Sequence, residues 1–331
     1  MKHILMLATG GTIASKKTNT GLTPSLLSEQ ILEYVPRIKT FCNVTTIQLC
    51  NIDSTNMSPE YWVKIAKAIE ENYNNYDGFV ILHGTDTMAY TAAALSYMIQ
   101  YSKKPIVLTG AQKPIDVDIT DAKANLFDSF VYACDDSSHG VTVVFGGQAI
   151  AGTRAKKIRT KSYNAFSSIN FPNKAVLHDG KIIRYITNDS FKETPDFYTN
   201  LDEKIYVLKL IPGTDAKIFQ YLKEHYSAIV IESFGVGGLP MYGNNDFSDA
   251  LADWLQCGKT IIMTTQVPYE GSDMETYRVG YKIKEKYELI EAYDMPLEAV
   301  VTKAMWILGQ TNNQKKVKEL FYTPVNFDIL R

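Results

Sequence analysis

The sequence predicts an α/β fold with two parts: a larger N-terminal, mostly parallel, doubly wound sheet and a smaller C-terminal α/β domain of Rossmann-like type. Three observations predict it. Strand-like and helix-like segments alternate through the first half of the chain. The run 78–82 is short and continuously apolar, which is typical of a strand buried on both faces of a parallel sheet. A second, shorter alternation begins near residue 205.

The individual elements follow from hydrophobic patterning and from turn signals. The first strand is expected at 3–9, and the polar stretch 15–21 after it is expected to be a loop. Ser25 is the expected N-cap of a helix over 25–35, and Asp179-Gly180 between two apolar runs predicts a β-hairpin. Further strands are expected at 44–49, 78–82, 105–109, 141–145, 205–210, 228–232 and 259–264. Further helices are expected at 59–73, 87–100, 121–134, 214–225, 246–256, 297–309 and 313–321.

The length of 331 residues exceeds the usual size of one domain, so two domains are expected. Residues 187–204 are polar, contain Pro195 and lack periodicity, which indicates a linker. The sequence therefore predicts an N-terminal catalytic domain over 1–186, this linker, and a C-terminal domain over 205–331.

Charge and cysteine usage exclude several classes of function. A formal net charge of −2 gives no overall attraction to nucleic acid or to an anionic membrane, so neither partner is expected. The four cysteines are scattered, without the spacing of a zinc site or a disulfide framework. The apolar run near the N-terminus is too short for a signal segment or a membrane span. We therefore expect a cytoplasmic protein.

Four polar loops follow four of the expected strands, and they hold most of the candidate functional residues. In a parallel sheet these loops share one edge, where some of them can converge on one cavity. Each loop also has an ordinary structural interpretation: Asp53-Ser54 suits an Asx turn, and Thr85 or Asp86 suits a helix N-cap. The loops contain residues 9–12, 51–56, 83–87 and 110–114.

The residue types in these loops favour a threonine nucleophile. None of the five histidines has an i,i+4 histidine partner, the G-x-S-x-G elbow is missing, and Gly10-Gly11-Thr12 lacks the spacing of a phosphate-binding loop. A threonine hydroxyl needs a base, which a lysine can provide. The segment 154–161 packs five cations closely, which indicates a solvated basic loop, but one of its lysines could turn toward Thr85 and Asp86.

Two of these segments resemble the signature motifs of the bacterial-type L-asparaginases, most closely the cytoplasmic type I branch. The motifs are Thr9-Gly10-Gly11-Thr12-Ile13-Ala14 and the segment 78–90, which ends His83-Gly84-Thr85-Asp86-Thr87-Met88-Ala89-Tyr90. The resemblance covers essentially the whole chain, with further matches at 53–59, 108–112, 233–237 and 294–299.

The resemblance implies an amidohydrolase that converts L-asparagine to L-aspartate and ammonia without a metal or a cofactor. Thr12 would attack the side-chain amide and form a β-aspartyl enzyme. Thr85, Asp86 and Lys157 would support it, with Lys156 as the competing lysine. Backbone N–H groups near Gly11 and Thr85 would form the oxyanion hole.

The resemblance also implies a substrate-binding set and an assembly. Ser54 and Thr55 would hold the α-carboxylate and amino groups, and Asp86 would face the substrate ammonium. The assembly would be a homodimer or homotetramer with its sites near the interface. The complete implied substrate-binding set is Gly11, Asp53, Ser54, Thr55, Gly84, Thr85 and Asp86.

One departure from the family pattern concerns the residue that covers the nucleophile. Many members have a tyrosine in the loop after the nucleophile, at the position that is Leu22 here. Tyr277 is the candidate replacement for that phenol, although it could equally be one of the structural tyrosines.

Three alternatives stay open at this point. The enzyme could prefer glutamine or another amide, or the chain could be a non-catalytic small-molecule-binding module on a Rossmann-like scaffold. It could also be the asparaginase-like component of a tRNA amidotransferase. That component normally carries an additional N-terminal domain, whereas the first motif here begins within ten residues of Met1, so this alternative is not expected.

Overall fold

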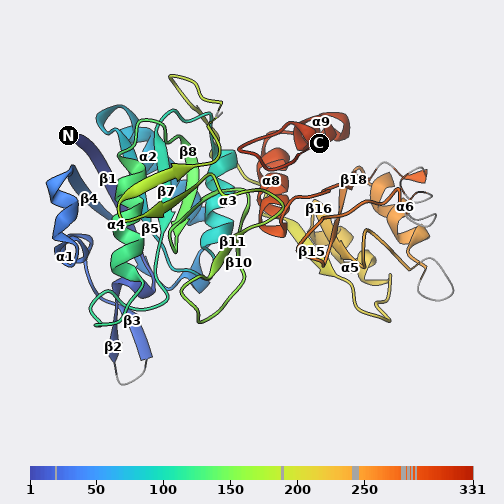
Figure 1. The fold of residues 1–331 in the computed structure, drawn as a ribbon. Coiled ribbons are helices and arrows are strands. Elements are labelled where there is room, and N and C mark those ends of the chain that lie inside the picture. Colours follow the sequence, from blue (N-terminus) through green and yellow to red (C-terminus); the bar gives the residue numbers. More distant parts are fainter. Residues whose placement is uncertain are drawn as a thin grey trace. The chain divides into compact units, whose positions relative to one another are not determined.

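The chain forms two compact units, Met1–Thr199 and Asn200–Arg331, each with a sheet of its own (Figure 1). The structure is a computed structural model, and it describes all residues except 19–20, 188–189, 241–245, 277–280, 282–283, 285, 288 and 331. The linker and domain boundaries expected from the sequence remain a prediction.

The N-terminal unit contains an eight-stranded sheet in the order β13-β12-β9-β8-β7-β5-β1-β4. Strands β4, β1, β5, β7 and β8 are parallel. Strands β9, β12 and β13 continue the sheet, each antiparallel to its neighbour. This confirms the predicted α/β class. The strands are β1 (Lys2–Gly10), β4 (Cys42–Ile52), β5 (Gly78–Leu82), β7 (Pro105–Thr109), β8 (Gly140–Phe145), β9 (Gln148–Ala151), β12 (Ala175–His178) and β13 (Lys181–Arg184).

The strand order places a topological switch point between β1 and β5. From β1 the chain moves one way to β4, and from β4 it returns past β1 to β5, β7 and β8. The crevice beyond the carboxyl ends of strands at such a point is where ligands bind in open α/β sheets. Thr12 follows β1 and Thr85 follows β5, so both lie at this crevice.

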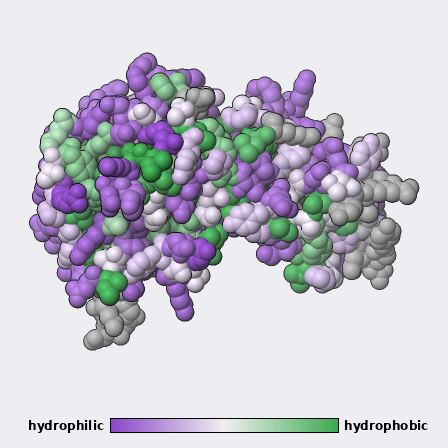
Figure 2. All heavy atoms as spheres, viewed as in Figure 1, coloured by the Kyte–Doolittle hydropathy of each residue, from purple (hydrophilic) through white to green (hydrophobic). Residues whose placement is uncertain are grey.

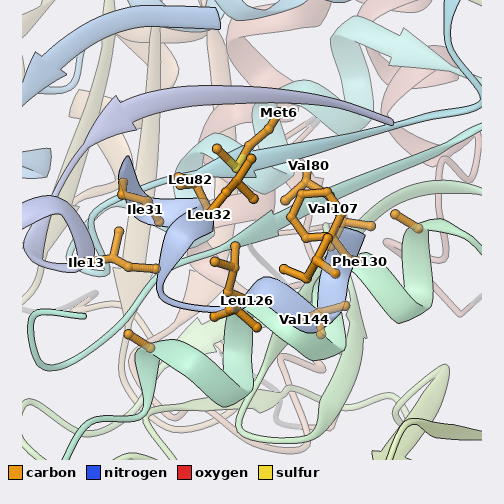
Figure 3. Close-up of a cluster of buried hydrophobic side chains, with 14 of the residues drawn as sticks. Met6, Ile13, Ile31, Leu32, Val80, Leu82, Val107, Leu126, Phe130 and Val144 are labelled. Carbon is orange, nitrogen blue, oxygen red and sulfur yellow. The ribbon is translucent and has the colours of Figure 1, made fainter. Parts of the chain in front are cut away.

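Helices cover both faces of the sheet, because alternate residues of its buried strands point to opposite sides. One face packs against α1 (Ser28–Glu33) and α4 (Ala122–Ala133) in a continuous apolar cluster (Figure 3). The other face carries α2 (Pro59–Asn72) and α3 (Met88–Met98). Labelled members of the cluster in Figure 3 are Met6, Ile13, Ile31, Leu32, Val80, Leu82, Val107, Leu126, Phe130 and Val144.

The β7–α4–β8 crossover has the opposite hand to its neighbours. Val144 of β8 faces α4. Val141 lies three residues earlier on the same strand and so points to the opposite face, where it lies beside Gly152 against α3. Helices α3 and α4 thus lie on opposite faces although both connect strands in the same direction across the sheet. Since such crossovers are right-handed in almost all cases, the α4 crossover is the left-handed exception. Its loop runs along the carboxyl edge of the sheet, where Ile115 N donates to Ile13 O over 3.3 Å.

Two local predictions near the nucleophile are wrong. The described residues of the expected loop 15–21 are strand residues: β2 (Ser15–Thr18) and β3 (Gly21–Pro24) pair as an antiparallel hairpin. The sequence could not reveal it, because its residues do not alternate in hydrophobicity. Ser25 does not cap the next helix. Its N–H donates to Ala14 O, and α1 begins at Ser28.

The other elements of the N-terminal unit agree with the predictions more closely. The hairpin at Asp179-Gly180 is confirmed, with φ of 50° and 73° at the two turn residues. Short antiparallel pairs escaped the sequence analysis because two- and three-residue strands leave no pattern. They are β10 (Ala155–Lys157) with β11 (Phe166–Ser168), and β6 (Ile99–Gln100) with β14 (Asp196–Phe197).

The C-terminal unit is a second, smaller α/β layer structure. Its four strands are parallel, in the order β15-β16-β17-β18, and its buried apolar cluster includes Trp254 and Phe247. Its elements are β15 (Ile205–Lys209), α5 (Ile218–His225), β16 (Ala228–Ser233), α6 (Ser248–Gln256), β17 (Thr260–Thr265), β18 (Ile290–Glu291), α8 (Leu297–Gln310) and α9 (Gln314–Tyr322).

The surface and helix lengths complete the description of the fold. Hydrophilic residues dominate the face in Figure 2, with apolar residues in small groups between them. Among the residues that the structure describes, no helix has both the length and the apolar character needed to cross a membrane.

Candidate active site

Two glycines bring the turn after β1 against the turn after β5. Gly10 and Gly11 have φ of 107° and 79°, a region that favours glycine. A Cβ atom on Gly11 would lie 2.4 Å from Cα of Gly84, so no larger residue fits without a backbone shift. Thr12 and Thr85 directly follow the two touching glycines. The fold therefore brings the two predicted threonine turns together.

The Thr85 hydroxyl and the Asp86 carboxylate share one ammonium group. Lys157 Nζ donates to Thr85 Oγ1 over 2.8 Å and lies 2.6 Å from Asp86 Oδ1. The Lys157 side chain is only 15% exposed, whereas that of Asp86 is 57% exposed, so the pair lies at the mouth of the crevice. Lys157 is the last residue of β10, and adjacent strand residues point to opposite faces. Lys156 therefore points away from Thr85.

The loop after β4 is held by an Asx turn and by contacts with the loop after β5. Asp53 Oδ1 accepts from both N and Oγ1 of Thr55, each over 2.8 Å, and so caps a short 3-10 helix. Ser54 is buried, and its hydroxyl accepts from Asp86 N over 3.3 Å. Its carbonyl accepts from Thr87 Oγ1 over 2.8 Å. The loop that carries the expected substrate-binding residues Asp53, Ser54 and Thr55 thus contacts Asp86 through Ser54.

The loop after β7 contributes a residue to which the sequence analysis gave no role. Thr85 Oγ1 donates to Gln112 Oε1 over 3.1 Å, and Gln112 Nε2 donates to Ser162 O over 3.2 Å. The Gln112 backbone N–H donates to the buried Asp121 carboxylate over 2.8 Å. Gln112 could have been found as a polar residue two positions beyond Gly110, at the same edge of the sheet. Asp121 left no comparable signal, because it lies outside the four polar loops, at the start of a helix.

A buried histidine fixes the backbone next to Gly84. His83 Nδ1 lies 2.7 Å from Gly84 O, and a carbonyl can only accept, so this nitrogen carries the proton. His83 Nε2 therefore accepts from Thr91 Oγ1 over 2.9 Å, and Trp62 Nε1 donates to Thr91 Oγ1 over 2.9 Å. Burial lowers the pKa of His83 to about 4. His83 is thus a neutral, fully buried support for the turn.

One backbone N–H group near the threonines already has a partner within the protein. The N–H of Gly11 donates to Ile52 O over 3.0 Å, so this group is already engaged and does not serve as an oxyanion donor. It holds the end of β1 against the end of β4. The expectation that backbone N–H groups near Gly11 and Thr85 form an oxyanion hole stays a prediction.

The basic segment 154–161 is only partly the solvated loop that was expected. Arg154 is fully buried, donates to Ile169 O over 3.4 Å and lies 5.5 Å from the Phe171 ring centroid. Arg159 and Lys161 are exposed, as expected of a solvated loop. The difference arises where the chain enters β10, because Arg154 and Ala155 are buried at that end of the segment.

The phenol expected near the nucleophile stays a prediction. Tyr277 lies outside the residues that the structure describes, as does the side chain of Leu22. The backbone of Leu22 pairs with that of Lys17 in the β2–β3 hairpin. Lys17 lies three residues beyond Ala14, the last residue of the short helix that begins at Thr12. Within the described part of the chain, no three His, Cys, Asp or Glu residues cluster in a way that could hold a metal ion.

Comparisons with known proteins agree with the two-unit organisation of the fold. A family model described as "Asparaginase, N-terminal" matches residues 3–190, and one described as "Glutaminase/Asparaginase C-terminal domain" matches residues 204–321. The L-asparaginase of Thermococcus kodakarensis is 37% identical over 319 residues, which cover 96% of each chain.

Two further matches bear on fold and function. A solved structure of the thermostable L-asparaginase from Thermococcus kodakarensis superposes with a TM-score of 0.94, at 35% identity and 99% coverage of both chains. A glutamyl-tRNA(Gln) amidotransferase component of the same organism is 35% identical over 337 residues, which cover 98% of this chain and 75% of that protein.

Proposed function

The chain belongs to the asparaginase family of amidohydrolases, and from this premise we propose that it hydrolyses L-asparagine to L-aspartate and ammonia. The observation that carries the proposal is the contact of Lys157 Nζ with Thr85 Oγ1 and Asp86 Oδ1, at 2.8 Å and 2.6 Å. It supplies a threonine hydroxyl with the cation and the carboxylate that such chemistry needs, next to a second threonine.

In the proposed reaction, Thr12 Oγ1 bonds to the side-chain amide carbon of the substrate. The hydroxyl proton passes through the Thr85–Lys157 pair to the leaving nitrogen, the C–N bond breaks, and ammonia departs. Backbone N–H groups of Thr12 and Thr85 stabilise the negative oxygen of the tetrahedral intermediate. Water then cleaves the β-aspartyl ester, which releases L-aspartate and regenerates the Thr12 hydroxyl.

Substrate orientation is assigned to the loops after β4 and β5. Asp86 is half exposed toward the crevice, so its carboxylate can pair with the substrate ammonium. Ser54 and Thr55 provide hydroxyl groups for the substrate carboxylate. A Cβ atom on Gly11 would meet the Gly84 backbone, and one on Gly84 would meet the Ser54 side chain, so the two glycines let these substrate-binding loops lie close together.

Ammonia release from L-asparagine by Thr12→Ala and Thr85→Ala variants tests the proposal. We expect each variant to lose turnover by about 10³-fold or more, because each removes a group that takes part in covalent or proton-transfer steps. Retention of near wild-type turnover in both variants would remove the assignment.

A second candidate function is ammonia release within an amidotransferase. The observation that favours it is the 35% identity to a glutamyl-tRNA(Gln) amidotransferase component. The chemistry of the first step would be unchanged, so the two functions differ in what consumes the ammonia. Turnover of free L-asparagine by the isolated chain, in preference to L-glutamine, supports the first function. Turnover that requires a partner protein and an aminoacyl-tRNA supports the second.

Three further features belong to the same proposal. We place the protein in the cytoplasm as a homodimer or homotetramer, as in the type I branch that the motifs resemble. We assign residues 1–186 and 205–331 to the two domains. We retain Tyr277 as the candidate phenol near Thr12.

A further inference from the structure

Gln112 connects three parts of the site through one side chain. Its Oε1 accepts from Thr85 Oγ1, on the loop after β5, over 3.1 Å. Its Nε2 donates to Ser162 O, on the connection that follows the Lys157 strand, over 3.2 Å. The amide therefore lies between the two segments that supply Thr85 and Lys157.

The direction of these hydrogen bonds determines where the hydroxyl proton of Thr85 points. Lys157 has only donors, so Thr85 Oγ1 must accept from it, and the Thr85 proton is then directed to Gln112 Oε1. Thr85 is 5% exposed, so water does not readily replace either partner.

We propose that Gln112 is a positioning residue that orients the Thr85 hydroxyl and holds the Lys157 segment against it. The inference rests on the proposed function, because it names the group through which the Thr85–Lys157 pair is set. Only an uncharged amide satisfies both contacts, since one end must accept and the other must donate. A carboxylate keeps the acceptor and loses the donor, whereas a thioether of similar length loses both.

The loop that carries Gln112 is itself fixed from behind. Asp121 accepts from the backbone N–H groups of Gln112 and Lys113, over 2.8 Å and 3.1 Å. Asn125 Nδ2 donates to Gly110 O over 3.0 Å. The left-handed crossover brings this loop along the carboxyl edge of the sheet, and α4 then anchors it. Gln112 thus meets Thr85 from a rigid support.

The charged groups around the network determine how a new charge would act. Asp86 faces Lys157 from the loop after β5, and Asp121 lies behind Gln112. Lys156 and Arg159 flank Lys157 on its own segment, and Lys113 adjoins Gln112. A carboxylate at position 112 would add a negative charge beside the Thr85–Lys157 pair, where it opposes removal of a proton from that pair.

The test compares Gln112→Met and Gln112→Glu with the wild-type enzyme, using ammonia release from L-asparagine across a range of pH. We expect Gln112→Met to lower kcat about tenfold or more with KM little changed, as loss of oriented hydrogen bonds to a reacting group predicts. Gln112→Glu should recover part of this loss. The pH at which its activity rises should be higher than in the wild-type enzyme. Gln148→Leu is the matched control, because Gln148 accepts from Asn173 at the far part of the sheet.

The possible outcomes separate this inference from the proposed function. Wild-type turnover together with inactive Thr85→Ala establishes the function, and the Gln112 variants then test the inference alone. Wild-type kcat in Gln112→Met overturns it. Equal losses of kcat in both variants, with the pH profile unmoved, also overturn it, because a purely structural role predicts that result. A KM increase without a kcat change would place Gln112 in substrate binding and likewise reject the positioning role.

Discussion

At the scale of single residues, the site depends on which way each side chain leaves its strand. Lys156 and Lys157 are chemically equal, and the sequence could not choose between them. The β10–β11 pairing directs Lys157 to Thr85 and Asp86, and alternation then turns Lys156 away. Two adjacent lysines of the same exposure class thus have different places in the molecule.

This pair of lysines provides a matched test of the proton-transfer group. Lys157→Met removes the ammonium from Thr85 and leaves a chain of similar length, so we expect kcat to fall by about 10²-fold or more. Lys156→Met removes an identical charge from the opposite face of β10 and should change kcat by less than about threefold. Steady-state ammonia release measures both. Equal losses in the two variants would show that the segment needs charge and not a particular lysine.

The sequence predicted a role for some residues of the candidate site and only a position for others, for a physical reason. Thr85 and Asp86 follow a buried strand that hydrophobic patterning detects, and the parallel arrangement fixes the edge at which they lie. Gln112 lies at the same edge, but its role depends on a hydrogen bond across 27 sequence positions. Contacts of that separation leave no local pattern, so a loop could be predicted and its function could not.

At the scale of elements, the site is built by turns that let two strand ends touch. Gly11 needs both its positive φ and its missing Cβ, because Gly84 Cα occupies the space that a Cβ would take. The burial of each element explains whether the sequence could predict it. Strands β5 and β7 are buried on both faces and read as apolar runs, whereas the polar β2–β3 hairpin has no apolar face to mark it.

Gly11→Ala tests the close approach of the two turns. The substitution adds backbone strain and a contact of 2.4 Å with Gly84, so we expect a loss of about 3 kcal/mol or more in unfolding free energy and loss of activity. Gly146→Ala is the control in the same unit. Its φ is 58°, but the nearest atom to its Cβ is 3.5 Å away, so only strain of about 1–2 kcal/mol applies. Urea unfolding measures both. Equal destabilisation would show that φ alone, and not the turn contact, requires glycine at position 11.

At the scale of the whole molecule, stability depends on pH through buried groups that oppose each other. Burial lowers the pKa of His83 to about 4. Between pH 6.5 and 4 this imidazole is therefore protonated in the unfolded chain and neutral in the folded protein. Burial raises the pKa of Asp128 to about 6, so between pH 6 and 3.8 the folded protein binds a proton first. As pH falls, His83 therefore destabilises the fold and half-buried Asp128 stabilises it. In the wild-type protein the two effects therefore oppose and partly offset each other.

Removing either group should expose the other. The neutral, hydrogen-bonding variant His83→Gln removes the loss of stability on acidification, which for a fully buried group is about 3 kcal/mol between pH 6.5 and 4. Its stability relative to wild type should therefore rise as pH falls. Asp128→Asn should show the opposite difference, a smaller one because Asp128 is partly exposed, and should be most stabilising relative to wild type above pH 6. Urea unfolding free energies across this range measure both differences, and titrations shared by all three proteins cancel in them. Three parallel stability curves would contradict the prediction, because they would mean that neither group changes its affinity for protons when the chain folds.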